Sequence, residues 1–258
     1  MQLELADRVV LVTGASRGIG RAIALAFARE RARLLVCARR ARDVRQVSAE
    51  LRKAGAPAVR AVPLDVTKPA AAEELMGCAL ELGGLDVVVN NVGGNRRKPF
   101  VETTDQDWCD LFELNVLSGL RIARAAIPLL RQRGGGSILF ISSIWGREAG
   151  GHGYTLYNAT KSAQLSAAKI MATELAADRI RVNTIAPGSI LFPGGGWDTR
   201  RQQDPEGIAD FVRRDLPLGR FGTPEEVASL AVFLASAAAS LITGATITAD
   251  GGQSRSLI

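Results

Sequence analysis

Short apolar runs alternate along the chain with longer amphipathic stretches. Residues 8–13 read RVVLVT, a β-branched apolar run that ends at a glycine and is typical of a strand buried on both faces. Over residues 18–31, apolar side chains recur every three or four positions, so one face of a helix can pack on a sheet. The chain therefore opens with a predicted strand followed by a predicted helix.

The same alternation continues toward the C-terminus. It predicts further strands over residues 33–38, 58–62, 86–89, 137–142, 179–185 and 245–248. It predicts further helices over residues 43–54, 70–82, 104–133 and 155–177. Such regular alternation, with right-handed crossovers, indicates an α/β fold, a doubly wound Rossmann-type parallel sheet of about seven strands flanked by helices on both faces. We expect a single domain over residues 1–258.

Residues 191–218 interrupt this alternation. They hold three successive glycines at 194–196, several prolines and a charged, helical piece. Long irregular segments in compact domains are usually functional or disordered, so we expect a lid over the substrate, with a surface loop as the alternative.

Composition and charge narrow the class of protein. Apolar residues make up 47% and charged residues 22%, which is typical of a globular protein. The apolar runs stop short of the roughly 18–20 residues that span a bilayer, and the first residues lack the order of a signal peptide, so we expect a cytoplasmic protein without membrane contacts. Cys37, Cys78 and Cys109 lack CxxC spacing and His152 is the single histidine, so we expect reduced thiols and no metal site.

The net charge of +6 raises the alternative of nucleic-acid binding. The arginines are scattered except between residues 39 and 45, and no recognition motif accompanies them. An anionic small ligand explains that cluster equally well, and we expect no nucleic-acid partner.

A phosphate-binding loop is predicted between the first strand and the first helix, where residues 13–20 read TGASRGIG. Gly14 permits a tight turn, Gly18 lets the backbone approach a pyrophosphate, and Gly20 lets the helix pack closely on the sheet. The helix N-terminus offers free N–H groups to the anion. A glycine-rich turn without a ligand is the alternative.

Tyr157 and Lys161 stand four positions apart on a predicted helix and therefore share one face. An adjacent ammonium favours a phenolate, so we expect Lys161 to lower the pKa of Tyr157 toward the range of acid catalysis. Ser143 follows the fifth predicted strand, at the sheet edge where ligands bind, and its hydroxyl can hold a substrate oxygen. Ser142 is the alternative, because only one of two neighbouring strand residues points inward.

These motifs together resemble the short-chain dehydrogenase/reductase family, in its short single-domain branch. The resemblance rests on TGxxxGxG at residues 13–20, NNVG at 90–93, Asn115, Ser143, the Tyr157/Lys161 pair and RVNTIAPG at 181–188, and it covers nearly the whole chain. The segment RFGTPEEVA at 220–228 is similar to 3-oxoacyl-[acyl-carrier-protein] reductases. The chain departs from the family pattern at Val92, at Phe192 and in a longer gap between Ser143 and Tyr157.

The resemblance implies a role for each motif residue. Tyr157 is the acid/base, Lys161 tunes it and holds the nicotinamide ribose, Ser143 orients the carbonyl, and Asn115 supports Lys161 through water. Asp65 and Val66 meet the adenine, Asn91 and Gly93 border the adenosine, and the backbone at Pro187, Gly188 and Ile190 holds the nicotinamide. The expected cofactor-binding set is Gly14, Ser16, Arg17, Gly18, Ile19, Gly20, Arg39, Asp65, Val66, Asn91, Gly93, Tyr157, Lys161, Pro187, Gly188 and Ile190.

The end of the second predicted strand indicates the choice of cofactor. Sites selective for NAD usually carry an Asp or Glu there, whereas this chain reads VCARR and has no carboxylate until Asp43. Arg39 follows the strand and Arg17 lies in the glycine loop, so two guanidiniums can bind a 2′-phosphate. We expect NADP(H) to be preferred, with NAD(H) as a usable alternative.

We therefore expect an NADP(H)-dependent oxidoreductase that interconverts a carbonyl and a secondary alcohol on a small molecule, with a 3-oxoacyl thioester as one candidate substrate. A nucleotide-binding regulator that has lost the chemistry is the alternative. We expect a homo-oligomer, a dimer or a tetramer, because the helices after Thr104 and Thr155 carry more apolar surface than one sheet face needs. His152 is expected to have no catalytic role, and Trp145 is expected either to line the substrate pocket or to pack against its neighbours.

Overall fold

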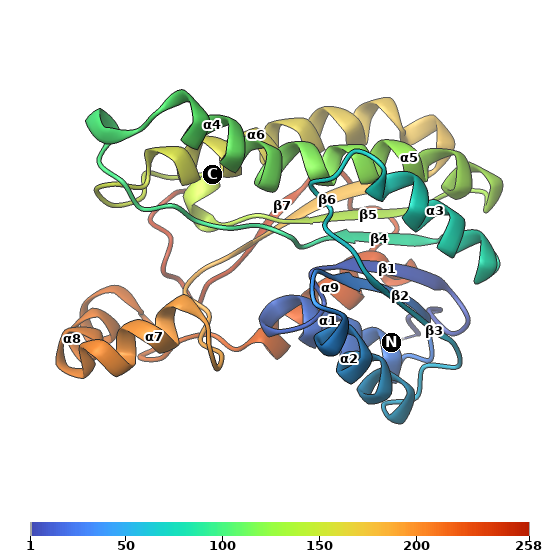
Figure 1. The fold of residues 1–258 in the computed structure, drawn as a ribbon, viewed down its shortest axis with the longest axis horizontal. Helices are drawn as coiled ribbons and strands as arrows, with labels where there is room; N and C mark the ends of the chain where they lie inside the picture. Colours follow the sequence, from blue (N-terminus) through green and yellow to red (C-terminus); the bar gives the residue numbers. More distant parts are fainter. Residues whose placement is uncertain (1, 258) are drawn as a thin grey trace.

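The computed structural model describes residues 2–257 and has the predicted α/β fold around one parallel sheet (Figure 1). Seven strands pair in the order β3-β2-β1-β4-β5-β6-β7. Their bounds are β1 Val9–Thr13, β2 Arg33–Ala38, β3 Val59–Pro63, β4 Val87–Asn90, β5 Gly136–Ile141, β6 Ile180–Pro187 and β7 Thr246–Ala249. The doubly wound sheet expected from the alternating pattern is confirmed.

The central strands are buried on both faces. Every residue of β1 and β4 is buried, and Val10 pairs with Leu34 on one side and with Val87 on the other. A strand covered from both sides has no solvent face, which is why these segments read as continuous apolar runs.

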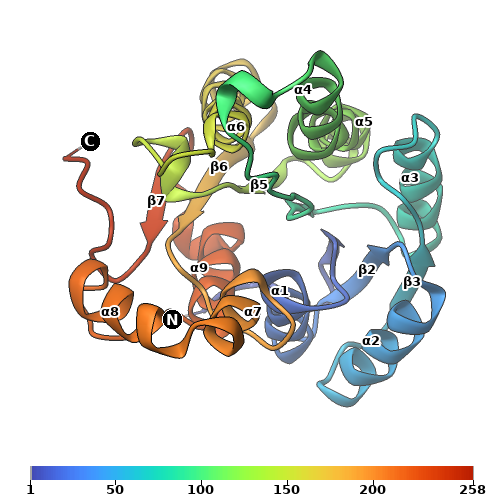
Figure 2. The same ribbon diagram turned by 60° about the vertical axis from the view of Figure 1, so that its left-hand side comes forward.

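Helices cover the two faces of the sheet in separate layers (Figures 1 and 2). One layer consists of α1 Gly18–Arg29, α2 Ala41–Lys53 and α9 Pro224–Ala235. The other consists of α3 Ala71–Glu81, α4 Asp105–Phe112, α5 Ser118–Gln132 and α6 Thr155–Glu174. Phe27 lies in the core of the first layer and Phe140 in that of the second. Across residues 2–257, no helix combines the length and the apolar character needed to cross a bilayer.

Short helical turns connect the larger elements. They are η1 Phe100–Glu102, the π-helix η2 Glu113–Leu117, η3 Ile144–Gly146, η4 Ala176–Asp178 and η5 Ala237–Ala239. The π-helix lies inside the helical region predicted over 104–133, where a uniform α-helix was expected.

The sequence analysis missed helix α9. The Thr223 hydroxyl accepts from the Glu226 N–H, the Glu226 carboxylate accepts from the Thr223 N–H, and Pro224 occupies the first helical position. This capping box followed by an apolar run is a recognised start signal for a helix. The signal was therefore present in the sequence.

Residues 191–218 contain more regular structure than expected. They fold into α7 Gly196–Gln203 and α8 Pro205–Asp215, drawn in orange beyond the carboxyl end of the sheet (Figures 1 and 2). The Trp197 ring stacks on Phe211 at 4.6 Å and lies 5.2 Å from Phe221, between ring centroids. A small aromatic cluster therefore joins these two helices to the segment before α9.

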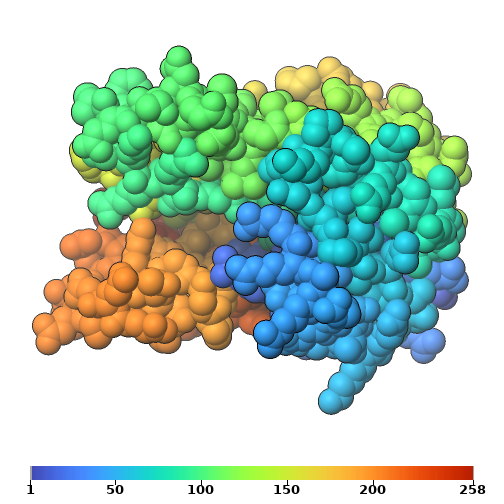
Figure 3. All heavy atoms as spheres, viewed as in Figure 1, coloured from blue at the N-terminus to red at the C-terminus, as the bar shows by residue number. Residues whose placement is uncertain are grey.

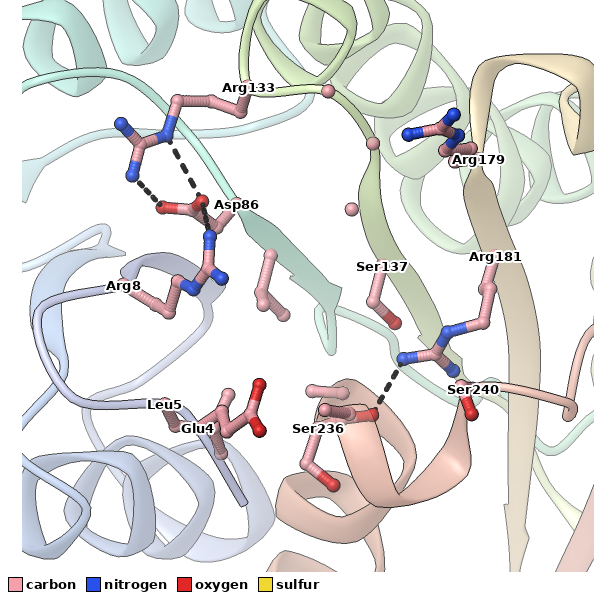
Figure 4. Close-up of a pocket in the computed structure, with 16 residues that line it drawn as sticks. Glu4, Leu5, Arg8, Asp86, Arg133, Ser137, Arg179, Arg181, Ser236 and Ser240 are labelled. Carbon is pink, nitrogen blue, oxygen red and sulfur yellow. Dashed lines mark hydrogen bonds and ion pairs between the residues drawn. The ribbon is translucent and has the colours of Figure 1, made fainter. Parts of the chain in front are cut away.

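The opposite, amino-terminal edge of the sheet is held by Asp86. Its carboxylate accepts hydrogen bonds from the Val9 N–H at 2.9 Å, from Arg8 at 3.0 Å and from Arg133 at 3.1 Å, and the residue is 5% exposed. Figure 4 shows Arg8 and Arg133 converging on this carboxylate. Asp86 thereby joins β1, β4 and the end of α5.

Replacing Asp86 by Ala should lower the free energy of unfolding by roughly 1–3 kcal/mol, because the buried Val9 N–H loses its acceptor and two arginines lose their partner. Urea unfolding followed by circular dichroism measures the change. The control is Asp210→Ala, which removes an exposed carboxylate paired with Arg213 and should change stability by less than about 0.5 kcal/mol. Equal stability of the two variants would contradict a stabilising role of Asp86 at the amino-terminal edge of the sheet.

Candidate active site

The glycine loop between β1 and α1 packs closely on the segment after β4. Gly14 has a φ of +65°, in the region that favours glycine. A Cβ on Gly20 would lie 2.4 Å from the Asn91 Nδ2 atom, which itself donates to the Thr13 carbonyl at 2.9 Å. The turn and the close approach predicted for these glycines are both present.

A cleft of about 730 Å³ opens at the carboxyl ends of the strands. Figure 3 shows the hollow between the blue N-terminal part, the green segment and the orange helices α7 and α8. The cleft brings together ten of the expected cofactor residues, namely Gly14, Ser16, Arg17, Ile19, Gly20, Arg39, Asp65, Val66, Asn91 and Gly93. It also contains residues that the sequence analysis did not single out, including Leu64, Thr67 and Leu114.

The cleft fits a dinucleotide. Helix α1 begins without a side-chain cap, so its first N–H groups point free toward the loop, as a pyrophosphate requires. Gly14, Gly20 and Gly93 line the cleft and carry no side chains, so a ligand there can approach their backbone. The residues present therefore suit a nicotinamide dinucleotide.

Two arginines, Arg17 and Arg39, line this cleft. Arg39 is exposed directly after β2, and Arg17 donates from Nη1 to the Gly194 carbonyl at 3.1 Å. The pKa of Asp65 is lowered, first by the Thr67 N–H that donates to its carboxylate and to a smaller extent by the charge of Arg39. Arg17 thus contacts the segment expected to form the lid.

Tyr157 lies in the first turn of α6, beside Ser143. Both residues line the same small pocket, and the Ser143 Oγ accepts from the Trp145 N–H at 3.2 Å. Ser142 is buried and donates to the Lys161 carbonyl at 3.1 Å. Of the two serines, Ser143 therefore faces the pocket.

The expected lowering of the Tyr157 pKa is wrong for the protein without cofactor. Burial of the phenol raises its pKa, and the nearby Ser143 hydroxyl offsets only part of this effect. The Lys161 Nζ atom lies 5.8 Å from the Tyr157 ring centroid, but burial lowers the pKa of Lys161 to about 7. At the pH where Tyr157 titrates, Lys161 is therefore largely neutral and gives the phenolate little stabilisation.

Lys161 is 4% exposed and is held by neutral oxygens. Its Nζ donates to the Ile141 carbonyl at 3.0 Å and to the Gln164 Oε1 at 3.1 Å. A Cβ on Gly93 would lie 3.2 Å from this Nζ, so the ammonium sits directly beneath the wall of the cleft. Lys161 is not itself part of the lining of the cleft, and its place next to a bound ribose stays a prediction.

Gln164 connects Lys161 with Asn115, a contact that the sequence analysis missed. The Gln164 Nε2 donates to the Asn115 carbonyl at 2.5 Å, within the π-helix. The Asn115 side chain binds both the N–H and the carbonyl of Gly94, and its Nδ2 donates to the Thr160 hydroxyl. The link expected to run from Asn115 through water thus has a side-chain route, and a polar residue three positions after Lys161 was the available signal.

A smaller pocket of about 210 Å³ adjoins the cleft, and Phe192 lines both. Its walls include Ser143, Tyr157, Gly188, Ile190 and Trp145. Trp145 also packs on Tyr154, with 4.5 Å between ring centroids, and its contact with a substrate stays a prediction. His152 is exposed and lies outside this lining.

Phe192 covers the glycine loop. A Cβ on Gly18 would lie 2.7 Å from its ring, so Gly18 is in contact with the segment 191–218 rather than open to the cleft. The departure from the family pattern at this position therefore places an aromatic ring at the junction of the two cavities.

Comparison with known proteins agrees with this geometry. The family described as enoyl-(acyl carrier protein) reductase matches residues 14–254. An uncharacterized oxidoreductase of Mycobacterium tuberculosis is 39% identical over 250 residues, covering 96% of this chain and 92% of the relative.

Two solved structures are similar along almost their whole length. L-sorbose reductase from Gluconobacter frateurii, complexed with NADPH and L-sorbose, has a TM-score of 0.94 at 33% identity, and all of both chains is covered. A 7α-hydroxysteroid dehydrogenase complexed with NADH and 7-oxo glycochenodeoxycholic acid has a TM-score of 0.89 at 32% identity, covering 98% of this chain and 97% of its own. As its motifs predicted, the chain belongs to the short-chain dehydrogenase/reductase family of oxidoreductases, which act on CH–OH groups.

Proposed function

We propose that this enzyme interconverts a carbonyl and a secondary alcohol on a small molecule, with NADP(H) as the preferred cofactor and Tyr157 as the acid/base. The observation that carries the proposal is that Ser143 and Tyr157 line one small pocket, which adjoins the cleft for the dinucleotide. The nicotinamide, when bound, supplies or accepts the hydride.

The site residues predicted from the sequence have the following parts in this proposal. The free N–H groups after the glycine loop hold the pyrophosphate, Asp65 and Val66 meet the adenine, and Asn91 and Gly93 border the adenosine. The backbone at Pro187, Gly188 and Ile190 holds the nicotinamide end, and Lys161 binds its ribose.

Tyr157 and Ser143 act on the substrate oxygen. In the direction of reduction, the Tyr157 hydroxyl protonates the carbonyl oxygen while the Ser143 hydroxyl donates a hydrogen bond to it. With a pKa near 7, Lys161 exchanges a proton readily at neutral pH, so it can return a proton to Tyr157 after each turnover.

The preference for NADP(H) is supported by the end of β2. No carboxylate lies at Cys37, Ala38 or Arg39 to accept ribose hydroxyls, and Arg39 stands at the edge of the cleft. One of the similar structures is complexed with NADPH and another with NADH, so membership of the family does not decide between the cofactors. Arg39 is therefore the residue on which we base the preference for NADP(H).

We also propose that residues 191–218 form the lid. Phe192 and the contact between Arg17 and the Gly194 carbonyl bring this segment over the glycine loop. A 3-oxoacyl thioester remains one candidate substrate, and assembly into a dimer or a tetramer remains a prediction.

Replacing Tyr157 by Phe should lower kcat roughly 100- to 10,000-fold while the Kd for NADPH stays within about threefold, because only the transferable proton is lost. NADPH oxidation with a panel of small ketones and fluorescence titration of NADPH measure the two quantities. Turnover near that of the wild type would overturn the assignment of Tyr157. A wild type that binds NADPH but reduces no carbonyl would favour the regulator instead.

Replacing Ser143 by Ala should lower kcat/KM roughly 10- to 1,000-fold, since one donor to the substrate oxygen is lost. The matched control is Ser142→Ala, which removes a hydroxyl bonded only to the Lys161 backbone and should stay within a few fold of the wild type. The opposite ranking of the two variants would transfer the role to Ser142.

Replacing Arg39 by Ala should weaken NADPH binding about tenfold or more and leave NADH binding unchanged, since a charge-assisted hydrogen bond contributes roughly 1.5–3 kcal/mol. The control is Arg40→Ala, which removes the next exposed arginine, outside the lining of the cleft. The Kd for NADPH and the Kd for NADH are measured for the wild type and both variants. An equal loss of affinity for NADPH and NADH in Arg39→Ala would contradict a contact with the 2′-phosphate.

A further inference from the structure

The small pocket beside Tyr157 has a positive charge in its lining. Among residues 2–257, Arg200 is the one charged side chain in its lining, which otherwise consists of aromatic, aliphatic and neutral polar groups. Arg200 comes from α7 and is half-buried. A substrate in this pocket therefore meets a cation and no carboxylate.

Arg200 lacks an acidic partner within the described chain. Its Nη2 donates to the Tyr154 hydroxyl at 2.5 Å, and its guanidinium lies 4.9 Å from the Trp197 ring centroid. The other arginines of α7 and α8 are all paired, Arg201 with Asp198, Arg213 with Asp210 and Arg214 with Asp215. The cation that faces the pocket is thus the one left without a counter-charge.

Tyr154 places this cation near the reacting groups. The Tyr154 and Tyr157 rings both pack on Trp145, at centroid distances of 4.5 and 6.1 Å. Tyr154 is 5% exposed, so the group that holds Arg200 is itself fixed in the core. Arg200 is therefore positioned by a rigid aromatic cluster rather than by solvent.

A second guanidinium, that of Arg97, adds positive charge near Tyr154. The Arg97 guanidinium lies 5.4 Å from the Tyr154 ring centroid, and no carboxylate among residues 2–257 pairs with it. Its neighbours Arg96 and Lys98 both bind Asp107. The two unpaired guanidiniums contact the same tyrosine, one at its ring and one at its hydroxyl.

We infer that Arg200 binds a carboxylate of the substrate, so that the enzyme acts on small oxo acids and the corresponding hydroxy acids. The inference rests on the proposed function, because it assigns the substrate class of that same pocket. A guanidinium is planar and binds a carboxylate through paired N–H groups, which fixes the orientation of the substrate carbonyl toward Tyr157. The pocket is smaller than the roughly 300–1,000 Å³ of sites for drug-sized ligands, in keeping with a compact acid. The carboxylate is bound by Arg200 and is not changed in the reaction.

The test compares acids with their neutral analogues. kcat/KM with NADPH is measured for 2-, 3- and 4-oxopentanoate and for their methyl esters, in the wild type and in Arg200→Gln. At least one acid should exceed its ester about tenfold or more in the wild type. Arg200→Gln should remove this advantage while the rate on the esters stays within about threefold.

Three further variants separate charge from structure. Arg200→Lys keeps the positive charge and should restore part of the preference for the acid. Tyr154→Phe removes only the hydroxyl that positions Arg200 and should raise KM for the acid with little effect on the ester. Arg213→Gln removes an exposed, paired arginine of α8 and should change neither substrate class.

A binding experiment keeps the inference apart from the proposed function. Binding of the same acids to NADPH-loaded Tyr157→Phe is followed by the fluorescence of Trp145 and Trp197, with and without Arg200→Gln. Acids that bind through Arg200 but are not reduced by the wild type support the carboxylate site and overturn the proposed reaction. Reduction of esters and acids at equal rates, unaffected by Arg200→Gln, overturns the carboxylate site and leaves the reaction standing. Acids that neither bind nor react also overturn it.

Discussion

The reversal of strand order at β1 is the constraint on which the site depends. Because β2 pairs with one side of β1 and β4 with the other, the two crossovers leave the sheet toward opposite faces and a crevice opens between them. All seven strands are parallel, so the segments after β1, β4, β5 and β6 meet at that edge. Gly14, Asn91, Ser143 and Gly188 reach one region from distant parts of the chain for this reason alone.

The sequence predicted the elements that burial makes unambiguous. Strands covered on both faces appear as uninterrupted apolar runs, and the glycine loop appears as a fixed spacing because close backbone contacts tolerate no side chain. The choice between Ser142 and Ser143 needed the geometry, since it depends on which side of the last strand residue the chain turns.

Other features could not be read from the sequence. The direction of the Tyr157 pKa depends on how far burial outweighs a neighbouring charge, and that balance is a property of the packed structure. The π-helix at Asn115 and the bridge through Gln164 arise from contacts between α6 and the helix before it. Helix α9, in contrast, could have been predicted, because the residues of its capping box are recognisable in the sequence.

The polar network under the cleft is continuous. Gln164 joins Lys161 to the π-helix, and Asn115 joins the π-helix to Gly94 in the segment after β4. Buried polar groups that satisfy one another in this way hold a single arrangement, because moving any one leaves others unpaired. The position of Lys161 is therefore determined by three elements at once.

Keeping Lys161 in this place weakens the fold. An ammonium surrounded by neutral oxygens and apolar side chains, with no carboxylate bonded to it, is so poorly solvated that its pKa falls from 10.5 to about 7. Near neutral pH the protein must either carry that unsolvated charge or give up a proton that the unfolded chain would keep, and both choices favour unfolding. If Lys161 has the role proposed above, part of the resistance to unfolding is given up to keep a proton-exchanging group in place.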